Sequence, residues 1–473
     1  MPSDLARDRP VRRKGSVEID AVPARAGWSA DVHRTLWHDT PHEVALVPAR
    51  RDETHDETHD ETHDETRRVA FDSVPRGCLG EGMTQRARVE WAPEMLRYDF
   101  GTGHPMAPDR LALTIGLADA LGLLEHVDLV RAGIADDALL TSVHEPAYVA
   151  AVRRAADEGV RDEARGLGTA DDPLFPSMHE ASARVVQGTV DAALAVWRGE
   201  CEHAVNITGG MHHAMPGAAS GFCVYNDVAV AIHALLAQGA ERVAYVDLDA
   251  HHGDGVQAVF WDDPRVLTVS VHESGRALFP GTGDPHETGG SAAPGSAVNL
   301  PLPSGAGDVG WLRAVDAVVP AVLRAFEPQV LVTQHGCDAH GLDPLSNLRV
   351  SVDAQRMAAQ RLHELAHELT GGRWLATGGG GYAIIDVVPR AWTHLIAVAA
   401  HRPIDPATPV PEAWRERVAA EYGREGPRLM TDGATPTFRS WGSGFDPSDD
   451  VDRAIRATRA MSFPLLGLDV DHD

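Results

Sequence analysis

The sequence predicts an α/β protein built on a mostly parallel sheet, and three observations support this fold class. Beyond residue 105, stretches with helical apolar spacing alternate with short β-rich runs, as in strand–helix–strand units. Five of these runs lead directly into residues that can do chemistry or approach a ligand closely. The chain has 473 residues, of which 43% are hydrophobic, so a large buried core is available.

The elements follow from apolar periodicity. It predicts six helices, which cover residues 109–123, 179–198, 226–238, 308–326, 352–370 and 387–400. It predicts five strands between them, over residues 203–208, 242–248, 265–271, 329–334 and 373–377. Ligand sites in open parallel sheets form outside the carboxyl ends of the strands. We therefore expect the five loops that follow these strands to converge on one site.

The first part of the chain has apolar spacing that fits neither a helix nor a strand. Residues 1–86 are therefore expected to form a disordered extension, and residues 87–473 the folded catalytic domain. Residues 52–66 repeat the letters DETH, which bring acid groups into every unit and no apolar face. If this segment were helical, His55, His59 and His63 would lie on one face and could bind a metal weakly. Asp and Thr are poor helix formers, however, so a solvent-exposed low-complexity segment is the favoured interpretation. Translation from Met83 is a further hypothesis.

Composition argues against several classes of partner. The formal net charge of −27 disfavours binding to nucleic acid, because phosphate backbones would be repelled. No apolar stretch approaches the roughly 18 residues of a membrane span, and the first residues are too charged for a signal peptide. The cysteines form no C-x-x-C pair, which fits a reducing cytoplasm: Cys78, Cys201, Cys223 and Cys337.

Residues with the chemistry of a metal centre follow the second and fourth strands. Asp249 and His251 can turn toward one ion, and Asp338 could complete a site of one imidazole and two carboxylates. An isolated Asp-x-His pair is weak evidence. The whole segment DLDAHHGDG at 247–255 is more specific, because burying its ionisable groups without a ligand would cost several kcal/mol for each unpaired group.

His212 and His213 follow the first predicted strand. An isolated His-His pair is more often a pair of core residues. Beside a metal, one imidazole can take a proton from water and return it to a leaving group, if a carboxylate such as Asp247 or Asp254 fixes its tautomer.

The remaining loops offer residues that could wall or complete a pocket. Gly378–Gly381 lack the Lys-Ser/Thr of a phosphate-binding loop, so close backbone packing is the better interpretation. Tyr382 is either an oxyanion donor or a core tyrosine. Phe222 and Phe279 are core residues or the walls of an apolar tunnel.

Together, these motifs resemble the histone deacetylase family, in particular its bacterial acetoin utilization branch, over roughly residues 90–400. The segments that carry the resemblance are His104-Pro105-Met106 with Arg110, GGMHHAMPGAASGFCVYND at 209–227, DLDAHHGDG at 247–255, FPGTGD at 279–284, QHGCD at 334–338 and GGGGY at 378–382. The resemblance implies one α/β domain with an eight-stranded, mostly parallel sheet and helices on both faces, a fold shared with the arginases.

The resemblance also implies roles for single residues. The metal ligands would be Asp249, His251 and Asp338, with zinc as the usual ion and ferrous iron as an alternative. The catalytic group would be His212 and His213, their partners Asp247 and Asp254, and Tyr382, which would polarise the acyl carbonyl. The substrate would be held by Gly221, Phe222, Phe279 and Leu345, with a rim carboxylate from Asp171 or Asp172. A structural potassium ion would lie at Asp247, Asp249, His251, Ser270 and Val271. Met211 stands where class I eukaryotic members have Trp.

The activity implied by the resemblance is metal-dependent hydrolysis of acetyl-lysine on proteins to lysine and acetate. In the acetoin branch the expected substrate is a metabolic enzyme such as acetyl-CoA synthetase, with no nucleic-acid or membrane partner. The alternatives are an acetylpolyamine amidohydrolase, an arginase-like ureohydrolase and an inactive acyl-lysine binder. A ureohydrolase would hold a second metal, for which Gly336 supplies no carboxylate, and an inactive binder should have lost part of the ligand set.

Overall fold

One eight-stranded sheet organises the chain in the computed structural model, which describes residues 86–472. Its strand order is β2-β1-β3-β8-β7-β4-β5-β6, and every neighbouring pair is parallel. The strands are β1 (Ala87–Glu90), β2 (Val127–Val130), β3 (His203–Asn206), β4 (Val243–Asp247), β5 (Val266–Glu273), β6 (Ala297–Leu302), β7 (Val330–Gln334) and β8 (Trp374–Thr377).

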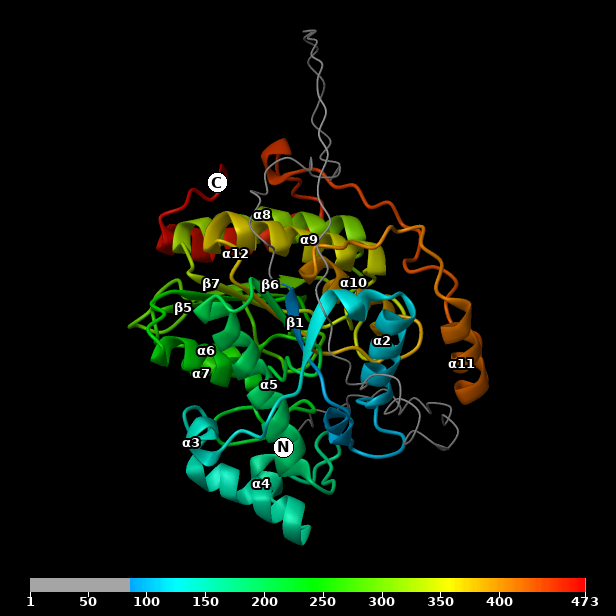
Figure 1. The fold of residues 1–473 in the computed structure, drawn as a ribbon. Coiled ribbons are helices and arrows are strands. Elements are labelled where there is room, and N and C mark those ends of the chain that lie inside the picture. The colour runs from blue at the N-terminus through cyan, green and yellow to red at the C-terminus, as the bar shows by residue number, and fades with distance from the viewer. Residues whose placement is uncertain (1–85, 473) are drawn as a thin grey trace, which may run out of the picture. The chain divides into compact units, whose positions relative to one another are not determined.

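Helices cover both faces of this sheet. They are α2 (Asp109–Ala120), α3 (Asp137–Leu140), α4 (Pro146–Glu158), α5 (Met178–Arg198), α6 (Asp227–Ala237), α7 (Asp254–Val259), α8 (Asp308–Phe326), α9 (Val352–Thr370), α10 (Val388–Ala399), α11 (Glu412–Tyr422) and α12 (Asp450–Ser462). Helices α5 and α6 lie on one face, and α8 and α9 on the other (Figure 1). The predicted α/β fold with an eight-stranded parallel sheet is thus confirmed.

The central strands are buried from end to end because helices cover both faces. All residues of β4 and β7 are buried, and they read as nearly continuous apolar runs. All five strands predicted from apolar runs are present, as are all six predicted helices. Helix α2 ends at Ala120, three residues before its predicted end, where Gly122 takes a left-handed conformation at φ 69°.

Three strands were not predicted from periodicity. Strands β1 and β2 have only four residues each, and β1 carries the charged Arg88 and Glu90. Strand β6 lies at the sheet edge and contains Pro301, a residue that lowers the expectation of a strand but is tolerated at an edge. Five helices were also missed, of which α3 and α7 have only four and six residues.

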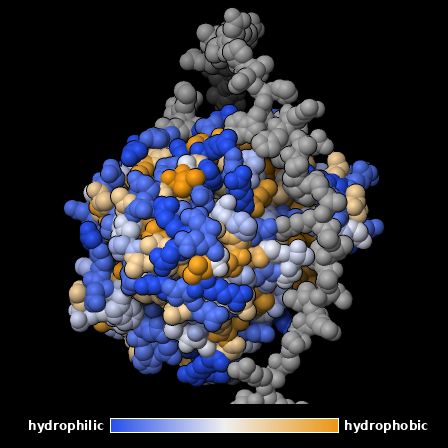
Figure 2. Space-filling view, turned by 90° about the horizontal axis from the view of Figure 1, so that it is seen from below, coloured by the Kyte–Doolittle hydropathy of each residue, from blue (hydrophilic) through white to orange (hydrophobic). Residues whose placement is uncertain are grey.

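The surface is mainly hydrophilic on the face shown in Figure 2, where small groups of apolar side chains are separated by polar ones. Among residues 86–472, no helix combines the length and apolar character needed to cross a membrane. The expected N-terminal extension with its DETH repeat, the start at Met83 and Cys78 lie outside the described residues.

Candidate active site

The loops after β3 and β4 bring two imidazoles and two carboxylates together. His212 Nδ1 lies 2.7 Å from Asp247 Oδ2, and His213 Nδ1 lies 2.7 Å from Asp254 Oδ1. The two Nε2 atoms lie 3.0 Å apart. All four side chains are buried, so each carboxylate fixes the Nδ1 proton of its histidine and leaves Nε2 to face the site.

The two histidines differ in basicity. Burial disfavours a charge on His212, but Asp247 and Asp249 outweigh it and raise the pKa of His212 to about 9. Burial and the neighbouring His212 lower the pKa of His213 to about 4. At neutral pH the pair therefore carries one positive charge, on His212, while His213 is neutral and able to accept a proton.

A group of side chains that could hold a metal ion lies beside this pair. His251 Nδ1 lies 3.1 Å from Asp249 Oδ1 and 2.9 Å from Asp338 Oδ2, and all three side chains are buried. The rings of His213 and His251 have centroids 5.9 Å apart. The three predicted ligands, drawn from the loops after β4 and β7, thus meet next to His212 and His213.

The donor set fits a divalent cation. One oxygen of each carboxylate is already bonded: Asp249 Oδ2 accepts from Gln334 Nε2 at 2.7 Å, and Asp338 Oδ1 accepts from the Ala250 N–H at 2.8 Å. The other oxygens point at His251. Although burial disfavours its charge, the two carboxylates hold the pKa of His251 well above its usual range. A positive charge is needed at this point, and a bound divalent ion would supply it in place of the proton.

Glycines pack directly on these carboxylates. A Cβ on Gly336 would lie 2.0 Å from Asp249 Oδ2, and a Cβ on Gly380 would lie 2.1 Å from Asp338 Oδ2. The backbone therefore closes over the ligands at a distance that only glycine allows. The loop after β8 contributes this packing and not a phosphate cradle.

Tyr382 follows the same loop and packs at the edge of the site. Its ring meets Phe222 in an edge-to-face contact with centroids 5.7 Å apart. Its backbone N–H donates to Asp343 Oδ2 at 2.7 Å, and Arg110 donates to the Gly379 carbonyl at 2.7 Å. Burial raises the pKa of Tyr382 well above its usual range, so the hydroxyl keeps its proton and remains a donor.

Aromatic residues wall the approach to the histidines. The Phe279 ring lies 4.9 Å from that of His213 between centroids and is 43% exposed. Gly221, at φ 54°, leaves room for both rings, because a Cβ there would lie 2.5 Å from His213 Cδ2 and 2.9 Å from Phe279 Cε1. Phe222 also has a positive φ, of 68°, which directs the chain through this turn.

The two candidate rim carboxylates differ in exposure. Asp171 is exposed, and its carbonyl lies 3.2 Å from His104 Nε2, whose ring packs on Phe222. Asp172 is buried, and burial followed by the charge of Asp171 raises its pKa to about 8. Of the two candidates, only Asp171 therefore has its side chain at the surface. Leu345 is half-buried beside Asp343.

The remaining predicted residues lie behind the site. Ser270 pairs with Asp247 across β4 and β5, and its hydroxyl lies 2.8 Å from His272 Nδ1. Ser270 and the adjacent Val271 are buried. Met211 is also buried and lines a small internal cavity with Tyr98 and other residues, namely Met106, Arg110 and Thr208.

Three supporting residues received no role from the sequence. The Tyr245 hydroxyl donates to Asp247 Oδ2 at 2.7 Å, Gln334 holds Asp249, and Asp343 holds the Tyr382 backbone. Tyr245 lies two residues before Asp247, hence on the same face of β4. Gln334 ends a predicted strand. The alternation of side chains along β4 could have identified Tyr245, and the polar residue at the end of β7 could have identified Gln334.

The fold and the site define the class of protein: a hydrolase with the fold shared by arginases and deacetylases. A family described as "Histone deacetylase domain" matches residues 104–399. The chain therefore belongs to the histone deacetylase family, in the branch of the acetoin utilization proteins.

Individual relatives agree with this assignment. "Acetoin utilization protein AcuC" of Bacillus subtilis (strain 168) is 42% identical over 330 residues, which cover 68% of this chain and 84% of the relative. AcuC of Staphylococcus xylosus is 37% identical over 337 residues, or 70% of this chain and 87% of the relative. A crystal structure of an HDAC homolog complexed with SAHA has a TM-score of 0.69 and 28% identity, covering 79% of this chain and 100% of that one.

Proposed function

We propose that this chain is a metal-dependent lysine deacetylase that hydrolyses acetyl-lysine in proteins to lysine and acetate. The observation that carries the proposal is the meeting of two His–Asp pairs, with Nε2 atoms 3.0 Å apart, beside the cluster of Asp249, His251 and Asp338. Amide hydrolysis needs a base for water, an acid for the amine and charge stabilisation for the oxyanion, and these groups can supply all three.

The proposed ion is zinc, with ferrous iron as the alternative, held by Asp249, His251 and Asp338. When bound, it would act as a Lewis acid on the acyl carbonyl and lower the pKa of water. Two carboxylates and one imidazole leave coordination positions for water and substrate, as expected for a catalytic site.

The chain's own residues move the protons. His213 Nε2 takes a proton from water as the water oxygen bonds to the acyl carbon. The Tyr382 hydroxyl donates a hydrogen bond to the carbonyl oxygen as its charge develops. The proton then passes from the histidine pair to the lysine nitrogen as the C–N bond breaks, which leaves acetate and a free amine. Asp247 and Asp254 keep the Nε2 atoms aimed at the reacting groups.

We propose that the substrate places a narrow apolar stem between the aromatic residues of the site and keeps its polar backbone at the rim. Gly221, Phe222 and Phe279 would contact the lysine methylenes, and Leu345 would lie near the entrance. The exposed Asp171 would accept hydrogen bonds from the substrate backbone N–H groups. A protein or peptide substrate is the proposed class, because its backbone N–H groups can donate to this rim carboxylate.

A ureohydrolase is disfavoured by packing. A second metal would need a carboxylate two residues before Asp338, where Gly336 stands. A Cβ at position 336 would lie 2.0 Å from Asp249 Oδ2, so there is no room for any side chain. The complete ligand set also gives no reason to propose an inactive acyl-lysine binder.

Two finer assignments belong to the same proposal. Because relatives are named acetoin utilization proteins, we propose a cytoplasmic substrate in acetoin or acetate metabolism, such as acetyl-CoA synthetase with an acetylated lysine. A structural potassium ion is proposed at the oxygens around Asp247, Asp249, Ser270 and Val271, next to His251.

The test offers the purified protein acetyl-lysine peptides and acetylpolyamines side by side, with zinc and with a chelator, and measures acetate released. We expect hydrolysis of the peptides at the higher kcat/KM, its loss with the chelator and its return with added zinc. Preference for the acetylpolyamine would replace the proposed substrate class. Hydrolysis that persists with the chelator would overturn the metal dependence. If neither substrate is hydrolysed, the proposed activity is overturned.

A further inference from the structure

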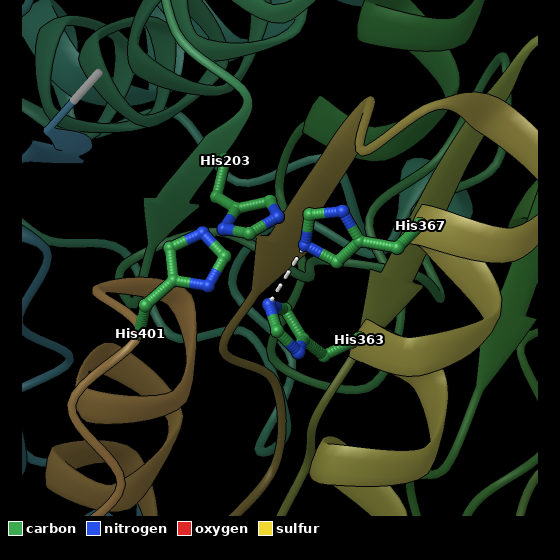
Figure 3. A group of neighbouring side chains, drawn as sticks. All are labelled: His203, His363, His367 and His401. Atoms are coloured by element: carbon green, nitrogen blue, oxygen red, sulfur yellow. Dashed lines mark hydrogen bonds between the residues drawn. The ribbon is translucent and has the colours of Figure 1, made fainter. Parts of the chain in front are cut away.

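A second group of imidazoles lies at the opposite edge of the sheet from the active site. His203 is the first residue of β3, His363 and His367 lie on α9, and His401 follows the end of α10. Figure 3 shows the four rings gathered around one point. Each offers a ring nitrogen, and these four nitrogens all lie within 4.8 Å of one another. No group of the proposed deacetylase mechanism reaches them.

The spacing on α9 is that of a helical metal-ligand pair. His363 and His367 are four residues apart, so both imidazoles project from one face of the helix. Their Nε2 atoms lie 3.2 Å apart. Two nitrogens of a tetrahedral zinc site, each about 2.0–2.1 Å from the metal, are about 3.3 Å apart. This pair already has the separation of one edge of such a tetrahedron.

His203 is oriented like a metal ligand. Its Nδ1–H donates to the Ala399 carbonyl at 2.7 Å, which fixes the tautomer and leaves the lone pair on Nε2. His203 is 1% exposed, and Nε2 has no hydrogen-bond partner. A buried acceptor aimed into a group of imidazoles is unsatisfied without a ligand.

The remaining rings lie around His203 and are only partly buried. The His401 ring lies 4.5 Å from that of His203 between centroids, and its Nε2 lies 3.7 Å from a carboxylate oxygen of Glu202. Trp374 packs against His203 and His363 at 5.5 Å and forms an apolar wall. His401 is half-buried, which leaves a route for an ion from solvent.

The structure assigns a second metal site to these four histidines. We propose that His203, His363, His367 and His401 bind one divalent transition-metal ion, for which zinc has the fitting geometry and ligand preference. Nitrogen separations of up to 4.8 Å must close by up to about 1.5 Å to reach a tetrahedral edge, a shift that ring rotation can provide.

The site is structural and not catalytic. Four protein ligands leave no position for water or substrate. Glu364 follows His363, as the general base does in H-E-x-x-H metalloproteases, but it pairs with Arg361 at 3.1 Å. An ion here would tie β3, α9 and the end of α10 together at the amino edge of the sheet.

The test compares wild type with His363→Gln/His367→Gln, after chelation and equilibration with zinc alone. We expect the variant to bind one fewer zinc per chain by elemental analysis and to keep its deacetylase activity. Exposed His286, replaced by Gln, is the matched control and should leave the stoichiometry unchanged. Equal zinc content in wild type and the cluster variant would overturn the proposal.

A second measurement leaves the histidines intact. In Asp249→Asn/Asp338→Asn, which lacks active-site ligands, zinc at 100 times its Kd should raise Tm by about 3 °C. Cobalt in the same protein should give the visible absorption of a tetrahedral nitrogen site. If that variant shows neither the shift nor the band, the proposal fails whether or not the cluster variant folds. Because the two sites share no residue, failure here would not affect the deacetylase assignment.

Discussion

Replacing Gly221 by Ala should disable the histidine pair without unfolding the protein. The new Cβ would lie 2.5 Å from His213 Cδ2, about 1 Å less than an ordinary carbon–carbon contact of about 3.5 Å. Phe279 is 43% exposed and can rotate away from its own 2.9 Å contact, but His213 is buried and bonded to Asp254. His213 must therefore shift by most of that 1 Å, and a misplacement of this size costs about 100-fold in kcat.

A matched control separates this effect from backbone strain. Gly281, at φ 92°, has no atom closer than 3.8 Å to an added Cβ, so Gly281→Ala should carry the cost of a positive φ without the clash. That cost is about 1–2 kcal/mol of stability for each variant. The assay is kcat on an acetyl-lysine peptide, with Tm measured in parallel. If kcat of Gly221→Ala lies within threefold of that of Gly281→Ala, the inference that Gly221 sets the position of His213 is refuted.

Other substitutions test the remaining groups. Tyr382→Phe should lower kcat by about 100- to 1,000-fold with Tm unchanged, because one oxyanion donor is removed; near-normal turnover would dismiss its role. Asp171→Asn should raise KM for a peptide, whereas Asp172→Asn should leave KM unchanged. Burial raises the pKa of Asp172 to about 8, so wild-type stability should fall as pH rises from about 4 to 8, and Asp172→Asn should flatten that part of the Tm–pH curve. An unflattened curve would mean that Asp172 does not titrate there. Burial opposes ionisation of Asp432, but His340 at 2.9 Å and Arg390 at 2.7 Å hold its pKa well below the usual range. The stability that ionised Asp432 contributes is therefore fully present above about pH 4 and is lost as the pH falls further. Asp432→Asn should lower the free energy of unfolding, measured in denaturant, by about 2 kcal/mol at pH 7 and by much less at pH 2. An equal loss at both pH values would contradict the ion pair.

The sequence alone determined most of the sheet and the identity of the central site residues. Buried parallel strands read as short apolar runs, so β3, β4, β5, β7 and β8 were each predictable from local composition. Because these strands are parallel, polar residues after each of them must meet at one edge. This constraint made the convergence of Asp249, His251 and Asp338 predictable across about 90 residues of chain.

Only the tertiary structure decided questions that depend on contacts between distant segments. Asp171 and Asp172 are adjacent and chemically alike, and packing alone exposes one and buries the other. Likewise, nothing local to His203 or His401 indicates that both meet the histidine pair of α9. Periodicity reports which face of an element is buried, since burial follows from local spacing. Which side chains then touch depends on how elements pack, and that information is carried by the fold as a whole.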